Sequence, residues 1–131
     1  MTFNFNTLID VAIAALFIWL LYLQFGPVRG LRTLAARDFD RELAEAPKEA
    51  LLLDVREAGE FRRGAIPKAV NIPLSALGRR LEEIPKDRSV YLYCQSGVRS
   101  KRAARLLKRR GYDRIAQLKG GIAAWDGKRT R

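Results

Sequence analysis

The longest apolar run of the chain lies near its start. Residues Leu8–Phe25 read LIDVAIAALFIWLLYLQF, and no strongly polar side chain interrupts the part from Val11 to Leu23. The run holds 18 residues, which approaches the about 20 apolar residues that a helix needs to cross a bilayer. The pattern therefore predicts a membrane-spanning helix, contained in an N-terminal anchor of residues 1–27.

Two other interpretations of this run are less favoured. A cleaved signal peptide begins with basic residues and ends at a small-residue cleavage site. Here no Lys or Arg precedes the run, and its end reads Gln24-Phe25-Gly26-Pro27. A buried core helix is not needed, because the rest of the chain is long enough to supply a complete domain.

The positions of the basic residues predict the orientation of the anchor. All 25 Lys and Arg residues lie after the apolar run, beginning with Arg29. Segments on the cytoplasmic side of a membrane helix carry an excess of Lys and Arg. We therefore expect a single-pass protein of the inner (cytoplasmic) membrane, held through residues 8–25, with its N-terminus outside and its C-terminal domain in the cytoplasm. A free thiol suits that compartment.

After a juxtamembrane linker of residues 28–33, short elements alternate along the chain. Apolar runs at Ala50–Val55, Ser89–Tyr93 and Ile115–Leu118 are typical of strands buried in a parallel sheet. Shorter strands are expected at 32–34 and 69–73, and helices at 36–46, 57–63, 75–84 (capped by Ser75), 100–110 and up to Trp125. The alternation predicts one α/β domain over residues 34–131, with a parallel sheet covered by helices on both faces.

The charge of the chain is strongly positive, with 25 basic against 14 acidic residues and a net charge of +11. Such a balance raises the question of nucleic acid. The sequence shows no nucleic-acid motif and no aromatic residues interleaved with the basic ones. Attraction of a membrane-tethered domain to anionic lipid is the simpler explanation, and we expect no nucleic-acid partner.

The only cysteine, Cys94, follows a predicted strand and precedes a predicted helix. Helix N-terminal N–H groups lack intrahelical partners, and they stabilise anions and thiolates. The chain has no histidine and no second cysteine, so a Cys–His pair and an intramolecular disulfide are excluded, and neither a metal site nor a cofactor is expected. A lone cysteine at a strand end is often a buried core residue, but the strand–turn–helix context with Gly97, Arg99 and Ser100 favours an active-site loop.

Four motifs in order resemble the rhodanese family, in its single-domain, membrane-anchored bacterial type. They are Leu53-Asp54-Val55-Arg56-Glu57 with Glu60-Phe61, the stretch 64–74 (GAIPKAVNIPL), Tyr93-Cys94-Gln95-Ser96-Gly97-Val98-Arg99-Ser100, and Leu118-Lys119-Gly120-Gly121-Ile122 with Ala124-Trp125. The resemblance covers about Arg32 to Gly127. Two residues depart from it: Ala65 stands where the family commonly has His, and Lys68 where it commonly has Gly.

The resemblance implies a small flavodoxin-like fold and a thiosulfate sulfurtransferase-type enzyme. Cys94 would accept sulfane sulfur from a small donor, such as thiosulfate or a persulfide, and pass it to a thiol or cyanide. The active loop comprises Gln95, Ser96, Gly97, Val98, Arg99 and Ser100. Its N–H groups would hold the persulfide charge, Gly97 would allow the tight turn, and Arg99 would bind the oxyanion of the donor. Asp54 and Arg56 are supporting residues that we expect to brace the loop by an ion pair.

Two alternatives to sulfur transfer stay open. One is a membrane-tethered binding module that uses the fold without turnover. The other is a Cys-loop phosphatase or arsenate reductase, although the six residues from Cys94 to Arg99 match the loop length associated with sulfur transfer. The basic residues after the loop form either a solvated face or a surface that steers anionic donors, with an acidic sulfur-carrier protein as a further partner.

Overall fold

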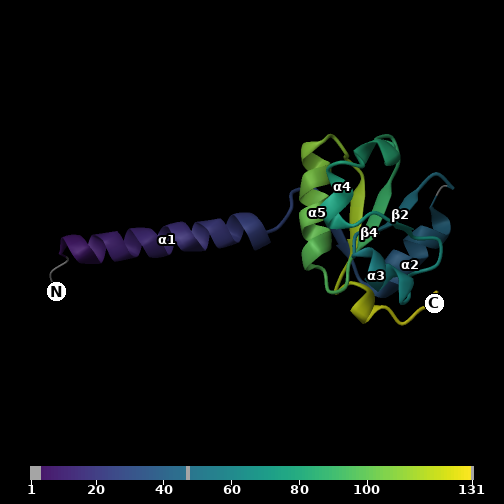
Figure 1. Cartoon of the computed structure of the whole chain (residues 1–131), viewed down its shortest axis with the longest axis horizontal. Coiled ribbons are helices and arrows are strands. Elements are labelled where there is room, and N and C mark those ends of the chain that lie inside the picture. Colours follow the sequence, from purple (N-terminus) through teal and green to yellow (C-terminus); the bar gives the residue numbers. More distant parts are fainter. Residues whose placement is uncertain (1–3, 47, 131) are drawn as a thin grey trace.

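One long helix, α1 (Phe5–Phe25), extends away from the rest of the chain in the computed structural model (Figure 1), which describes residues 4–46 and 48–130. Asn4 begins α1 by accepting a 2.8 Å hydrogen bond from the Thr7 N–H, and Gly26 ends it with an N–H bond of 2.7 Å to the Tyr22 carbonyl. None of its residues is buried. Among the described residues, α1 is the one helix that is long and apolar enough to cross a membrane.

The rest of the described chain folds around a five-stranded sheet in which all pairings are parallel. The strands lie in the order β1 (Arg32–Leu34), β5 (Ile115–Leu118), β4 (Val90–Tyr93), β2 (Leu51–Asp54) and β3 (Val70–Asn71). All residues of β4 and β5 are buried, as expected for continuous apolar strands inside a parallel sheet. The parallel α/β sheet predicted from the sequence is confirmed.

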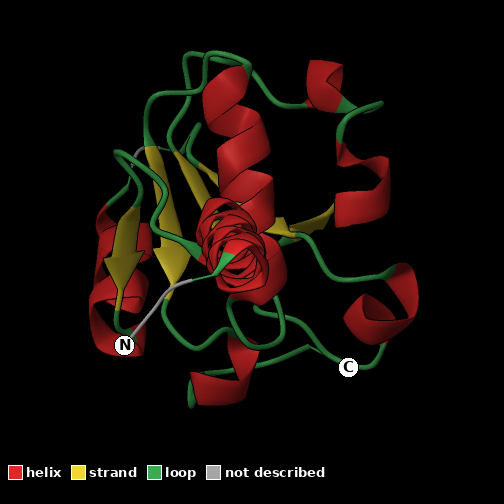
Figure 2. Ribbon diagram, turned by 90° about the vertical axis from the view of Figure 1, so that its left-hand side faces the viewer, coloured by secondary structure: helices red, strands yellow, loops and turns green. Residues whose placement is uncertain are grey.

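Helices cover both faces of the sheet (Figure 2). On one face lie α4 (Leu74–Leu77), the short 3₁₀ helix η1 (Leu81–Glu83) and α5 (Val98–Arg109), with a core that includes Leu77, Leu92 and Leu107. The other face carries α2 (Ala36–Glu45) and the 3₁₀ helix η2 (Ile122–Ala124). There Phe39 meets the rings of Tyr91 and Trp125 edge-on, at centroid distances of 5.8 and 6.3 Å. The remaining helix, α3 (Ala58–Arg62), follows β2.

The expected helix from Ser75 to Ile84 is wrong. The structure has α4, a turn and η1 in its place, and Pro73, not Ser75, stands at the N-cap of α4. The Ser75 hydroxyl instead donates to Glu57 at 3.1 Å. The break follows Gly78, the C-cap of α4, and Arg80 has the non-helical angles φ −120° and ψ 23°. The Tyr112 hydroxyl bonds the carbonyls of Leu81 and Ile84, at 3.0 and 2.6 Å, and so fastens the second half of the segment to the domain.

The last expected helix is a single 3₁₀ turn, which ends before Trp125. The strand expected at 32–34 is present as β1, and its residues Arg32 and Thr33 pair with β5. The expected linker of residues 28–33 overlaps this strand by two residues.

The two departures from the family pattern lie together, before β3. Ala65 is buried, and its backbone bonds Thr130 near the C-terminus, with Thr130 N–H donating to its carbonyl at 2.7 Å. Lys68 has φ +73°, and it is the only non-glycine residue with positive φ in the described part of the chain. Such a conformation costs an L-residue about 1–2 kcal/mol, which glycine avoids. The lysine therefore occupies a position whose backbone suits the glycine common in the family.

We predict that Lys68→Gly raises the free energy of unfolding by about 0.5–1 kcal/mol, because relief of the backbone strain exceeds the entropy that a new glycine loses on folding. Urea titration of the full chain in detergent measures the change. Lys68→Ala is the matched control, since it removes the amine and keeps the Cβ atom. An equal gain in both variants would show that the amine, and not the backbone conformation, is the cause.

Candidate active site

The active-site loop connects β4 to α5. Tyr93 ends the strand, Cys94 follows it, and α5 begins at Val98. Gly97 stands at the helix N-cap with φ +105°, a backbone conformation that residues other than glycine rarely adopt. The turn brings the N–H of this N-cap residue to the Cys94 sulfur.

The Cys94 sulfur lies beneath this loop, and the residue is 1% exposed. The backbone N–H of Gly97 donates to Sγ at 2.9 Å, and the Ser100 hydroxyl oxygen lies 3.5 Å from Sγ. A short N–H contact of this kind stabilises negative charge on sulfur. The structure thus brings together the Cys94 sulfur, the Gly97 amide and the Ser100 hydroxyl.

A buried chain of polar groups runs from Ser100 to the edge of the sheet. The Ser100 hydroxyl donates to Oε1 of Gln117 at 2.8 Å, and Nε2 of Gln117 donates to the Thr33 hydroxyl at 3.0 Å. Gln117 is 4% exposed and Ser100 is fully buried. Because Gln117 takes the hydroxyl hydrogen, the Ser100 oxygen is free to accept from the Cys94 thiol. The sequence analysis missed Gln117, although a polar residue inside an apolar strand is the signal that could have singled it out.

The segment after β5 holds the back of the loop. Ile122 N–H bonds the Cys94 carbonyl at 2.9 Å, and Ala123 N–H bonds the Gln95 carbonyl at 3.1 Å. A Cβ atom on Gly121 would lie 2.5 Å from the backbone of both loop residues, so only glycine permits this approach. These contacts direct the carbonyls of Cys94 and Gln95 toward η2. The Cys94 sulfur accepts its N–H bond from Gly97, on the other side of the loop backbone.

Arg99 is held by a carboxylate that the sequence analysis did not assign to it. Its two terminal nitrogens bond both oxygens of Glu60 on α3, at 2.6 and 2.9 Å. The bonds to Arg99 lower the pKa of Glu60 to about 2, against an opposing effect of burial. The Arg99 pKa is raised, first by Glu60, with a smaller contribution from Cys94. No sequence spacing indicates the pair, because its members lie 39 residues apart.

Asp54 and Arg56 form the expected ion pair, and it is buried. Their side chains are 0% and 4% exposed, with Nη2 of Arg56 2.8 Å from Oδ2 of Asp54. Arg56 also donates to the Gly64 carbonyl at 2.7 Å and to the Gln95 side chain at 3.4 Å. Burial opposes the charge of Arg56, but its bonds to Asp54 more than offset this and the Arg56 pKa is raised. The pair thus touches the loop at Gln95.

Within residues 4–46 and 48–130, no group of three acidic, cysteine or histidine side chains is placed to hold a metal ion. The site offers a buried sulfur that accepts one backbone N–H and lies beside the Ser100 hydroxyl oxygen, with the Arg99 guanidinium on the first turn of α5. Such an arrangement suits a nucleophilic thiolate and the anionic species that it forms.

Comparison with known proteins gives one family. The model of the rhodanese-like domain matches residues 36–128. The Bacillus subtilis protein YqhL is 42% identical over 123 residues, which cover 94% of each chain. A protein of Allochromatium vinosum named sulfurtransferase is 45% identical over 78 residues, covering 60% of this chain and 73% of its own length. The crystal structure of a rhodanese-related protein from Thermoplasma volcanium aligns with a TM-score of 0.67 at 29% identity, over 76% of this chain and 97% of that one.

We predict that the Arg99–Glu60 pair stabilises the fold at neutral pH and stops doing so in acid. The pKa of Glu60 is about 2 in the folded chain and 4.5 ordinarily. Its contribution is therefore complete above about pH 5 and is lost as the pH falls toward 2. The difference in melting temperature between the native chain and Glu60→Gln should shrink over this range. Glu49→Gln, at an exposed turn, is the control, and an equal pH dependence in both variants would contradict the prediction.

We predict that Asp54→Ala lowers the free energy of unfolding by about 3–5 kcal/mol, because it leaves the Arg56 guanidinium buried without its carboxylate. The control is Asp38→Ala, which removes the exposed partner of Arg41 and should cost about 0.5 kcal/mol or less. Urea unfolding of the full chain in detergent measures both changes. A similar cost for the two variants would mean that the buried pair does not stabilise the site.

Proposed function

The chain belongs to the rhodanese-like family, and from that premise we propose that it is a membrane-anchored sulfurtransferase that carries sulfane sulfur as a persulfide on Cys94. The relatives named as sulfurtransferases support sulfur transfer in general. The observation that carries the proposal for Cys94 is the 2.9 Å bond from the Gly97 N–H to its sulfur at the end of β4. That contact supplies the thiolate environment that a histidine-free site must obtain from its backbone.

The reaction has two displacement steps. In the first, the Cys94 thiolate attacks the outer sulfur of thiosulfate, the sulfur–sulfur bond of the donor breaks, and sulfite leaves with the bonding electrons. The enzyme then holds a Cys94 persulfide anion. In the second, an acceptor thiolate attacks the terminal sulfur of that persulfide, a new persulfide forms on the acceptor, and the Cys94 thiolate is restored. Cyanide as acceptor would leave as thiocyanate. This is ping-pong covalent catalysis.

The loop residues divide the work between them in this proposal. The Gly97 N–H stabilises charge on Sγ, while the other amides between Gln95 and Ser100 serve the terminal sulfur. Arg99 binds the oxyanion of the donor. Its bidentate bond to Glu60 uses two of the five N–H groups of the guanidinium, so donors for an anion remain. Glu60 then acts as a positioning residue, which fixes the direction of Arg99.

Asp54 and Arg56 support the loop from the neighbouring strand. Because Arg56 is anchored by Asp54 and by the Gly64 carbonyl, its third contact limits the movement of the Gln95 side chain. The position of Gln95 matters, because its carbonyl is also held by η2. We propose that the ion pair keeps the amide groups of the loop directed at the sulfur, and that it makes no contact with substrate.

We propose further that residues 1–27 anchor the enzyme in the inner membrane with the catalytic domain in the cytoplasm. The length and composition of α1 support a span. The alignment with YqhL covers 94% of this chain, so it extends into the apolar helix as well as the domain. Basic residues that all follow α1 support the cytoplasmic placement of the domain. The acceptors that we propose are small thiols and an acidic sulfur-carrier protein, which the positive domain would attract.

One observation favours a second candidate, a membrane-tethered binding module without turnover. Cys94 is 1% exposed, so a donor reaches its sulfur only if the loop side chains yield. The third candidate, a Cys-loop phosphatase or arsenate reductase, is supported by the same anion-binding loop. These candidates differ from sulfur transfer in what remains on Cys94 after exposure to a sulfane donor.

We predict that the full chain, incubated with thiosulfate, gains the mass of one sulfur atom, and that dithiothreitol removes it. The reason is that a thiolate held by loop amides displaces sulfite and retains the outer sulfur. Intact-mass spectrometry measures the gain. In Cys94→Ser the gain should be absent.

A second control moves the thiol along the loop, in the double variant Cys94→Ser with Ser96→Cys. Ser96 is exposed, so its replacement presents a thiol of ordinary reactivity. Retention of sulfur by this variant would show that any accessible thiol suffices and that the loop geometry is not responsible. Absence of sulfur on the native chain would instead favour the binding module or oxyanion chemistry.

A further inference from the structure

Helix α5 lies directly across the end of α1. Figure 1 shows α5 as the element of the domain nearest to α1, and Figure 2 shows it crossing behind the end of α1. The two terminal nitrogens of Arg105 bond the carbonyls of Gln24 and Gly26, at 2.9 and 3.0 Å. Lys101 bonds the carbonyl of Phe25 at 3.3 Å. Side chains of α5 therefore satisfy carbonyl groups that the end of a helix leaves without partners.

These contacts fix the depth of α5 relative to a bilayer. The 21 residues of α1 span about 31 Å, which matches the about 30 Å hydrocarbon core. When α1 crosses the membrane, the carbonyls of residues 24–26 thus lie at the boundary of the hydrocarbon. The headgroup layer beyond it is about 5–7 Å thick on each side. Nitrogen atoms within hydrogen-bond distance of these carbonyls must then lie in the headgroup layer.

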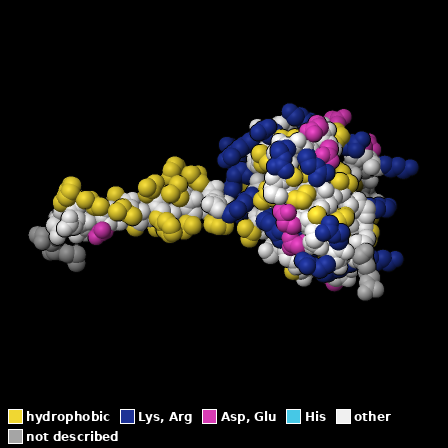
Figure 3. Space-filling model, viewed as in Figure 1, with side chains coloured by type: hydrophobic (Ala, Val, Ile, Leu, Met, Phe, Trp, Pro, Cys, Tyr) yellow, Lys and Arg dark blue, Asp and Glu magenta, His cyan; other side chains and the backbone are white. Residues whose placement is uncertain are grey.

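The same face of α5 is uniformly basic. We call Lys101, Arg102, Arg105, Lys108 and Arg109 the α5 basic surface; no acidic residue occurs in this helix. In Figure 3 dark blue side chains gather where α1 meets the domain. None of the five forms an ion pair with a carboxylate in the described part of the chain. The opposite face, with Ala103, Ala104 and Leu107, is buried in the core.

We infer that the α5 basic surface binds the headgroups of anionic phospholipids and holds the catalytic domain flat against the membrane. The inference rests on the proposed span of α1 and goes beyond it, because an anchor alone leaves the orientation of the domain free. The occupant is a lipid surface, since the contacts of Lys101 and Arg105 with α1 place this face of α5 at headgroup depth. Anionic lipid supplies the negative charge that the surface lacks within its own chain.

The orientation has a consequence for the active site. Cys94 lies just before α5, and Ser100, which contacts its sulfur, is the residue before Lys101. The Cys94 loop is therefore attached to the N-terminal end of the helix that faces the headgroup layer. A groove on the other face of the sheet, lined by Leu43, Ile66, Lys68 and Trp125, lies beside α2 and therefore faces away from α5 and the membrane.

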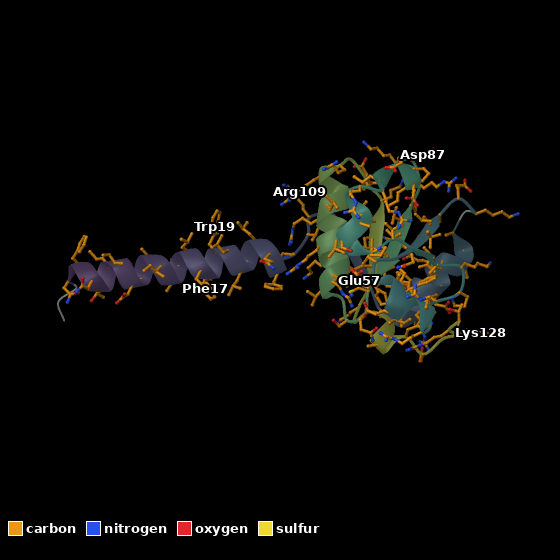
Figure 4. All side chains as sticks on the ribbon, viewed as in Figure 1. Phe17, Trp19, Glu57, Asp87, Arg109 and Lys128 are labelled. Atoms are coloured by element: carbon orange, nitrogen blue, oxygen red, sulfur yellow. The ribbon has the colours of Figure 1, made fainter. Side chains whose placement is uncertain are left out.

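The test uses the full chain in bilayer nanodiscs, with the Cys94→Ser change and a nitroxide label on either Arg109→Cys or Lys128→Cys. Figure 4 shows Arg109 on the side of the domain that faces α1 and Lys128 at the far side. Collision with nickel-chelating lipid headgroups is measured by electron paramagnetic resonance. In bilayers rich in anionic lipid, we expect the label at 109 to be relaxed at least about fivefold more than the label at 128.

The matched variants are Arg102→Glu with Lys108→Glu on the surface, and Arg62→Glu with Arg63→Glu away from it. The first pair should remove most of the difference between the two labels, and the second should leave it. Equal relaxation at 109 and 128 in anionic bilayers would overturn the inference, and so would an unchanged difference in the first variant. An alkaline carbonate wash of vesicles that hold the full chain tests the span separately. Release of the chain by that wash would overturn the span itself and the inference with it.

Discussion

The parallel pairing of β2 with β4 is the constraint on which the site depends. Its register sets Asp54 opposite Tyr93, so the residues that follow the two strands leave the sheet side by side. The buried Asp54–Arg56 ion pair and the Cys94 loop are therefore neighbours. The register of the sheet, and not the conformation of the loop, brings them together. The same arrangement places both at the carboxyl edge, where open α/β sheets bind their ligands.

Because the chain has no histidine to act as a base, the proposed reaction depends on backbone N–H groups to stabilise negative charge on the Cys94 sulfur. The backbone of the loop is oriented by its carbonyl groups. Those of Cys94 and Gln95 accept hydrogen bonds from N–H groups of η2. Gly121 permits this close approach, and Gly97 turns the chain so that its own N–H meets the sulfur. A site of this kind depends on the fold of its loop more than on any single charged residue.

The sequence predicted the elements whose formation depends on residues close together in the chain. It did not predict the contacts between residues that are far apart in the chain. The Cys94 loop and the strands around it follow from short, continuous patterns, and the family resemblance added the order of the motifs. The bonds of Glu60 to Arg99 and of Gln117 to Ser100 join residues 39 and 17 positions apart, and they depend on which elements become neighbours in the sheet. The helix expected from Ser75 to Ile84 was wrong for a local reason, because the apolar spacing of its residues did not reveal the break between Gly78 and Arg80.

The proposed reaction requires that backbone amides of the loop hold sulfur on Cys94. The amide proton shift of Gly97 in the isotope-labelled full chain, before and after loading with thiosulfate, reports this contact. We expect this proton to move more than those of residues outside the loop, dithiothreitol to reverse the change, and Cys94→Ser to show none. A loaded chain in which the Gly97 amide proton keeps its shift would contradict the proposal, because the sulfur would then be held without the loop.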